Sequence, residues 1–202
     1  DEVRLCQTSV LSISGMYKEA WEMLHGIDRA TLPDSLLPAF YDCGRQLYSF
    51  LANYSHNSSY AANYIRLQNA YRDSLLTVLS SALPEYRLYE AERFIANQQF
   101  THAKNMLVGL LHDQPETSNI YARAAFSLAH LYKDEKQTDA YEKYLALSAI
   151  SDIKASVKEN AALSNLAFVL YERGDVSRAY RYIKRSLEDA IFCNARLRTV
   201  EI

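Results

Sequence analysis

Apolar residues recur at the spacing of amphipathic helices along most of the chain, and short polar turns separate these helices. The pattern is clearest near the C-terminus, where two successive apolar faces consist of Leu163, Leu166, Ala167 and Leu170 and of Ala179, Ile183 and Leu187. Between them, Gly174 can adopt the left-handed conformation that ends a helix, and Asp175 can cap the next helix. The segment is therefore predicted to be a helical hairpin.

An alanine early in the second helix marks this hairpin, and the same setting recurs along the chain. The alanines are Ala20, Ala103, Ala140 and Ala179. Ala62 lies about midway between Ala20 and Ala103, so that successive alanines of the set lie roughly 40 residues apart. A small side chain at this point allows two antiparallel helices to approach closely. A period of roughly 40 residues built from helix–turn–helix units predicts an α-helical solenoid.

The pattern predicts an all-α fold of about ten helices in a single repeat domain spanning residues 1–202. The five expected hairpins lie near 1–31, 34–83, 84–114, 117–150 and 152–192. Gly15 precedes Ala20 by the same number of residues as Gly174 precedes Ala179. The turns before Ala103 and Ala140 contain no glycine. The second hairpin is expected to have longer helices, over 34–53 and 59–83, and residues 189–202 to extend the last helix or add a short one.

Composition excludes several classes of protein. Apolar residues make up 49% of the 202 residues, which is typical of a folded chain. Only five glycines and four prolines are present, which disfavours all-β folds and glycine-loop nucleotide-binding folds. The net charge of −2 predicts no general affinity for nucleic acid through this chain. No apolar run approaches the roughly 18 residues of a membrane span, so any membrane link is expected only through segments outside the chain.

The sequence contains no recognisable catalytic or metal-binding motif. The five histidines never fall three or four residues apart, the glycines form no phosphate-binding loop, and Cys6, Cys43 and Cys193 show no metal-ligand spacing. His130 is interpreted as a hydrogen-bonded packing residue. We therefore expect no enzyme, no cofactor and no metal. A hydrolase within a helical fold stays as a third alternative, which a buried cluster of histidines and carboxylates would favour.

Tyrosine is abundant, with 16 residues. Such rings can pack between repeats and leave their hydroxyl groups in water, or they can line an aromatic groove. The concave face of a helical solenoid is formed by the first helix of each unit. By helical phase, the candidate groove residues are Glu92, Arg93, Arg123, Tyr132, Phe168, Tyr171 and Glu172. For each of them, exposure on an ordinary solvated surface is the open alternative.

A basic stripe lies on the last predicted helix, where Arg178, Arg181 and Arg185 share one face. A solvated outer face, supported by Glu188 and Asp189, accounts for it. The alternative is attraction to an acidic partner or to lipid head groups.

The turn and the alanine resemble the tetratricopeptide repeat (TPR), most closely over residues 174–179 and 15–20. The resemblance implies a right-handed α–α superhelix, although the period is longer than in that repeat and no unit carries the leading tryptophan. One version of this repeat grips peptide carboxylates with lysine and asparagine. The equivalent positions here are Leu88, Glu92, Ala125, Ala129, Ser164 and Phe168, and because they carry no cation, we expect a different role.

The end of the repeat region in a Bacteroidetes family of membrane-anchored regulators is similar to residues 152–161, 174–175, 178–184 and 194–198. In that family a signal peptide precedes the repeats, and a single membrane helix and a cytoplasmic regulatory part follow them. The resemblance implies that this chain is a periplasmic sensing portion that takes part in signal transduction or transcriptional regulation.

Together these observations predict a non-catalytic module that binds a protein or peptide partner or another ligand. The expected context is the extracytoplasmic sensor of a membrane-anchored regulator. The alternative is a soluble cytoplasmic TPR scaffold or adaptor with the same fold.

Overall fold

The computed structural model describes residues 1–56, 58–158, 161–195 and 199. Its described part consists of helices and connecting turns, without a β-strand. Consecutive helices pack in pairs, as in a tetratricopeptide-like helical solenoid, and the predicted all-α fold class is confirmed. The chain divides into two compact units, Asp1–Ala82 and Leu83–Ile202, which are described separately.

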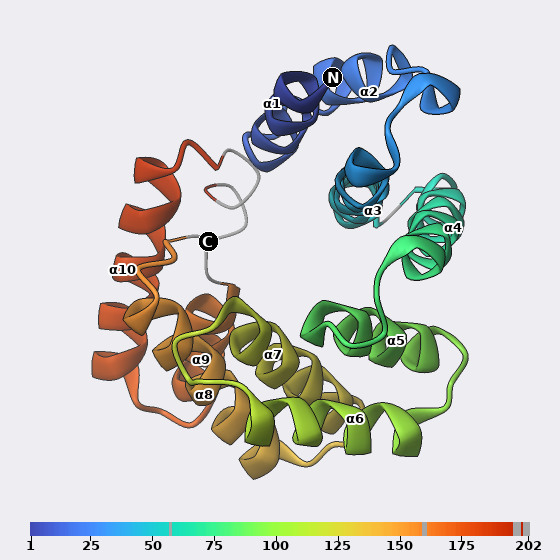
Figure 1. Cartoon of the computed structure of the whole chain (residues 1–202). Helices are drawn as coiled ribbons and strands as arrows, with labels where there is room; N and C mark the ends of the chain where they lie inside the picture. The colour runs from blue at the N-terminus through green and yellow to red at the C-terminus, as the bar shows by residue number, and fades with distance from the viewer. Residues whose placement is uncertain (57, 159–160, 196–198, 200–202) are drawn as a thin grey trace. The chain divides into compact units, whose positions relative to one another are not determined.

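The second unit is a regular stack of three helix pairs (Figure 1). Its helices are α5 (Pro84–Ala96), α6 (Phe100–Asp113), α7 (Asn119–Asp134), α8 (Thr138–Lys154), α9 (Ala161–Glu172) and α10 (Val176–Phe192). One apolar cluster joins α5 and α6 to α7, with Leu107 and Leu128 fully buried. A second joins α7 and α8 to α9 and α10, around Leu145 and Leu163. Each pair therefore shares its core with the next, and this sharing holds the unit together.

The turns inside the pairs have the same backbone geometry whether or not they contain glycine. Gln98, Lys136 and Gly174 have φ values of 59°, 59° and 82° and follow one another along the chain at two equal intervals. In each turn the next amide donates to a carbonyl five residues earlier, at 2.8–2.9 Å. This is the bonding of a left-handed helix C-cap. Asp175 caps α10 as predicted, because its side chain accepts a hydrogen bond from the Arg178 amide at 3.0 Å.

The repeated alanine is confirmed at three of its five predicted positions. Ala20 and Ala103 are fully buried, and Ala179 is 5% exposed. In α8 the equivalent position, five residues after the left-handed turn residue, is held by Tyr141, so the assignment of Ala140 was one residue too early. Ala62 is exposed and does not mark the second pair.

The first unit combines a short pair with a long one. Its helices are α1 (Glu2–Ile13), α2 (Tyr17–His25), α3 (Leu37–Tyr54) and α4 (Ala61–Val78), with two 3₁₀ turns, Arg29–Thr31 and Asp34–Leu36, before α3. Gly15, at φ 76°, forms the turn between α1 and α2. In the long pair the close approach depends on Gly44 of α3, because a Cβ there would lie 2.2 Å from two Tyr71 ring atoms of α4.

Two predicted helix ends differ from the structure. The helix expected over 59–83 stops at Val78, because Leu79 adopts an extended conformation with ψ of 142°. At the other end of the chain, α10 stops at Phe192, and Asn194 has a φ of 53° that prevents its continuation. Most of the rest of the segment 189–202 lies outside the described residues, as do residues 159–160 and 196–198 of the stretches compared above.

Ion pairs connect successive pairs of the second unit at equivalent positions and with opposite polarity. Lys104 of α6 lies 2.5 Å from Glu135, which follows α7. One repeat later, Glu142 of α8 lies 2.6 Å from Arg173, which follows α9. At the first junction the second helix of a pair carries the cation and the turn of the next pair carries the anion. At the following junction the helix carries the anion and the turn carries the cation.

Candidate functional site

The predicted site residues lie on the first helices of the three pairs, in the second unit. In Figure 1, α5, α7 and α9 follow one another along one side of this unit, while α6, α8 and α10 lie along the other. We call the surface formed by α5, α7 and α9 the first-helix face. The seven residues predicted from the sequence meet four different environments on these helices.

Glu92 and Arg123 form a bridge across the first-helix face. The Arg123 guanidinium donates to the Glu92 carboxylate at 3.0 Å, and both side chains are mostly buried, at 29% and 23% exposure. The guanidinium also lies 5.0 Å from the centre of the Tyr89 ring and donates to its hydroxyl at 3.4 Å. The bridge joins α5 to α7 and stabilises the pairing of the two helices.

Arg93 is not part of this bridge. Its guanidinium donates to Glu90 at 2.9 Å, three residues earlier in the same helix. Such a pair within one helix contributes a few tenths of a kcal/mol to helix stability. The arrangement favours the solvated alternative for this residue.

Tyr132 points away from the first-helix face, toward the second helices. Its ring stacks on Tyr144 of α8 at 5.3 Å and an interplanar angle of 2°, and the Lys104 ammonium of α6 lies 4.4 Å from its centre. The packing alternative accounts for this tyrosine, because it fills the junction of α6, α7 and α8.

Phe168, Tyr171 and Glu172 are open to solvent. Phe168 is 54% exposed and Tyr171 is 64% exposed, and no ring contact of either is found among the described residues. Since the three residues lie within one helical turn of α9, they share a face. We call this group the α9 site.

The repeat register also identifies two positions that were not among the candidate groove residues. His130 and Lys133 of α7 occupy the places that Phe168 and Tyr171 occupy in α9. His130 packs edge-on against Phe126 at 4.5 Å and Tyr141 at 6.2 Å, and no hydrogen bond to its ring is found in the described part of the chain. Burial lowers its pKa, and Lys133 acts in the same direction, which favours the neutral imidazole. His130 is a packing residue, as predicted, but without the expected hydrogen bond.

Four of the six positions compared with the carboxylate-gripping repeat are not on a surface. Leu88, Ala125 and Ala129 are fully buried, and Ser164 is 6% exposed. Only Glu92 and Phe168 of that set face the first-helix side, so the helical phase assumed for the other four was wrong.

The basic stripe of α10 is largely paired within its own helix. Arg178 lies 2.5 Å from Asp175, and Arg185 lies 3.2 Å from Asp189, which is buried and also meets Lys158 at 3.4 Å. These pairs favour the structural explanation of the stripe.

A second aromatic surface, on α2 and α3 of the first unit, was not predicted. Tyr17 packs between Phe50 at 6.4 Å and Tyr54 at 5.7 Å, and Trp21 stacks on His25 at 4.2 Å. The signal in the sequence was the spacing of Tyr17, Trp21 and His25 at four-residue intervals. Because these rings have ring partners, packing explains most of this surface.

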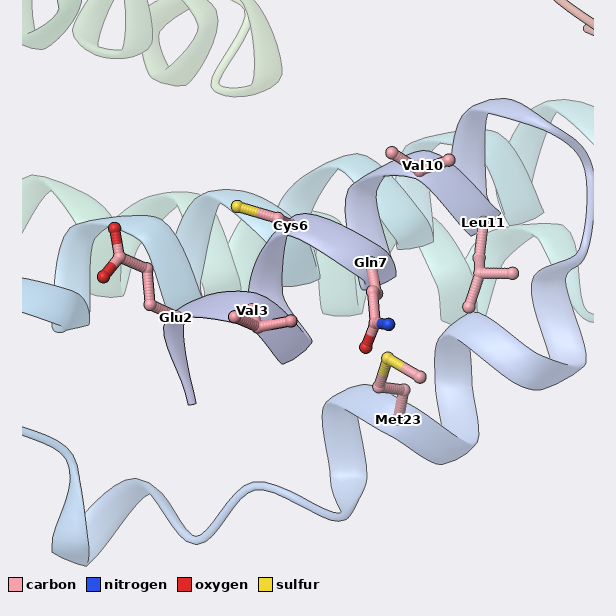
Figure 2. Close-up of a pocket in the computed structure, with 7 residues that line it drawn as sticks. All are labelled: Glu2, Val3, Cys6, Gln7, Val10, Leu11 and Met23. Atoms are coloured by element: carbon pink, nitrogen blue, oxygen red, sulfur yellow. The ribbon is translucent and has the colours of Figure 1, made fainter.

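A hollow of about 570 Å³ lies on α1 and α2 of the first unit. Figure 2 shows its lining along α1, with Gln7 opposite Met23 of α2. In the repeat register, Val3, Gln7 and Val10 correspond to Ala124, Leu128 and Leu131 of α7, which α7 buries against the preceding pair. By this register, the hollow lies on the face of α1 that corresponds to the packed face of α7.

Neither metal chemistry nor a membrane span is indicated in the described residues. They contain no group of three or more histidine, cysteine, aspartate or glutamate side chains suited to a metal ion. Nor does any helix among them combine the length and the apolar character that a bilayer requires.

Comparison with known proteins gives one match. The family described as the SusR N-terminal TPR domain matches residues 1–202, the whole chain. No curated protein and no solved structure matches the chain. TPR-type domains are non-catalytic repeat folds that mediate protein–protein interactions. The helix pairs, their left-handed turns and this match agree, and the chain belongs to the family of SusR N-terminal TPR domains.

Proposed function

We propose that this chain is the partner-binding sensor of a membrane-anchored signalling or transcriptional regulator and that it acts outside the cytoplasm. Membership of the SusR family supports the link to regulation. The resemblance of residues 152–161, 174–175 and 178–184 to membrane-anchored regulators of Bacteroidetes supports the compartment.

The partner is a protein segment that lies against the first-helix face. The observation that carries this proposal is the pair of exposed rings at the α9 site, for which no contact with another ring is found among the described residues. Exposed aromatic residues are enriched at protein interfaces because they offer a large contact area at little cost in conformational entropy.

The compartment can be tested in cells with a native thiol of the chain. Cys6 is exposed, whereas Cys43 is buried and Cys193 is half-buried. After reduction, a maleimide that does not cross the inner membrane should label the full-length protein in intact spheroplasts, and Cys6→Ser should lose this label. Labelling only after the inner membrane is lysed would support the cytoplasmic scaffold instead.

The binding face can be tested by photocrosslinking in the native cell envelope. A benzophenone side chain at position 168 should give a crosslinked partner, whereas the same group at Val108 of α6, which is 46% exposed, should give none. Equal adducts at both positions, or none at position 168, would contradict the proposed face.

A further inference from the structure

The α9 site combines two open rings with a carboxylate on one helical face. Tyr171 follows Phe168 by three residues and Glu172 follows it by four, so their Cβ atoms lie about 5–6 Å from that of Phe168. The electron-rich faces of aromatic rings and a carboxylate both attract positive charge.

The carboxylate of Glu172 forms no ion pair with the described residues. Its neighbour Arg173 is already held by Asp139 at 2.7 Å and Glu142 at 2.6 Å. Lys133 of α7 lies over the Tyr141 ring, 5.5 Å from its centre. The negative charge of Glu172 is felt at Tyr141, whose pKa is raised by burial first and by Glu172 second.

In the preceding pair, the side chains at the equivalent positions contact aromatic rings of the same unit. There His130 is covered by Phe126 and Tyr141, and Lys133 lies on a ring. In α9 the equivalent positions are both aromatic, and both are more than half exposed. The α9 site therefore presents exposed rings that a partner can contact, and it does not form a packing junction with the described residues of the unit.

We infer that the α9 site binds a cationic side chain of the partner, an arginine or lysine flanked by apolar residues. This inference rests on the proposed binding face and names the chemistry that the face recognises. The cation lies against Phe168 and Tyr171 and pairs with Glu172, while the apolar neighbours cover the exposed ring edges. Arginine is favoured over lysine, because its planar guanidinium can stack on a ring and meet a carboxylate with two donors at once.

The test uses three short acetylated peptides that differ at one position. The central residue is arginine, its uncharged isostere citrulline, or glutamate, each between two leucines in a glycine–serine background. NMR titration of the 202-residue chain should show the arginine peptide binding about tenfold more tightly than the citrulline peptide, and the glutamate peptide binding most weakly.

Variants then assign the effect to the site. Glu172→Gln should reduce the preference for arginine over citrulline to about twofold, and Phe168→Ala should weaken both peptides. Tyr180→Ala is the matched control, because Tyr180 lies on α10 and is as exposed as Tyr171, at 64%. This control should bind all three peptides as the wild type does.

The outcomes separate this inference from the proposed function. Equal binding of arginine and citrulline peptides, an unchanged preference in Glu172→Gln, or no binding of any peptide would each overturn the inference. A crosslinked partner at position 168 would then still support the binding face. If neither the crosslink nor peptide binding were observed, both the proposed binding face and its proposed recognition of a cation would be wrong.

Discussion

The long helix pair of the first unit closes by different means from the helix pairs of the second unit. In the second unit, Ala103 and Ala179 lie at the contact and a left-handed residue makes the turn, at a constant interval. In the long pair of the first unit, Gly44 lies beneath the Tyr71 ring, and Tyr48, Phe40 and Tyr41 surround that ring. The second unit tolerates variation within a fixed backbone frame, whereas the long pair of the first unit depends on one closely fitted aromatic cluster.

The strongest challenge to this comparison is Gly44→Ala. A Cβ would lie 2.2 Å from two ring atoms of Tyr71, and the neighbouring rings limit how far Tyr71 can move. We expect the free energy of unfolding to fall by about 3 kcal/mol. Urea unfolding measures this loss, and Tyr71→Leu in the same background should recover part of it. A loss below about 1 kcal/mol would show that the cluster is not closely fitted.

Asp152 tests how far the regular backbone of the second unit tolerates a buried carboxyl group. It lies at the end of α8, is 8% exposed, and occupies the position of Ala190 in α10. Burial raises its pKa from 3.8 to about 6. Because the folded-state pKa is the higher one, the stability that the protonated group contributes is complete below pH 3.8 and is lost as the pH rises through about 6.

Asp152→Asn should therefore raise the free energy of unfolding by about 2 kcal/mol at pH 7 and leave it almost unchanged at pH 4. Thermal unfolding across this pH range measures the difference. An equal effect of the substitution at both pH values would mean that the carboxyl group does not titrate with the raised pKa.

The turns allow a test with opposite signs. At Gly174 a Cβ would meet no atom within 4 Å, so Gly174→Ala should lower the free energy of unfolding by about 1 kcal/mol through backbone strain alone. Gln98→Gly and Lys136→Gly should each raise it by about 0.5 kcal/mol, because glycine removes this strain but loses more conformational entropy on folding. Chemical denaturation of the three variants should give these signs, and a loss in either glycine variant would contradict the shared turn geometry.

An effect as small as that of the two glycine variants is expected at the ion pairs between helix pairs. Glu135→Lys places two cations together, because Lys104 lies opposite, and should cost about 0.5 kcal/mol at low salt. Adding Lys104→Glu should recover most of this, apart from the contact of Lys104 with Tyr132. A double-mutant cycle at two salt concentrations checks the prediction, and additive losses would show that the pair contributes nothing.

The sequence was sufficient to predict the fold because its signals are local. Apolar periodicity identified the helices, and Gly15 and Gly174 identified two turns through their freedom at positive φ. The equivalent turns at Gln98 and Lys136 were located only approximately, because these residue types do not by themselves indicate a left-handed conformation. That uncertainty produced the one-residue shift at Ala140, since a register error of one residue rotates a helix by about 100°.

The candidate site was harder to predict, because helical phase alone does not show what lies opposite a residue. Tyr132 and Phe168 both read as surface aromatics, yet Tyr144 and Lys104 cover the first and no ring lies on the second in the described structure. The bridge between Glu92 and Arg123 joins residues 31 positions apart, a contact that no local pattern encodes.

The reversed polarity of the two inter-pair contacts has a consequence for how such an array can grow. A tandem duplication of α7 and α8 would place Glu142 of the first copy against Glu135 of the second, so that two anions would meet where an anion and a cation meet now. Each pair is thus matched in charge to its present neighbours, and such a duplication would leave one junction with two like charges.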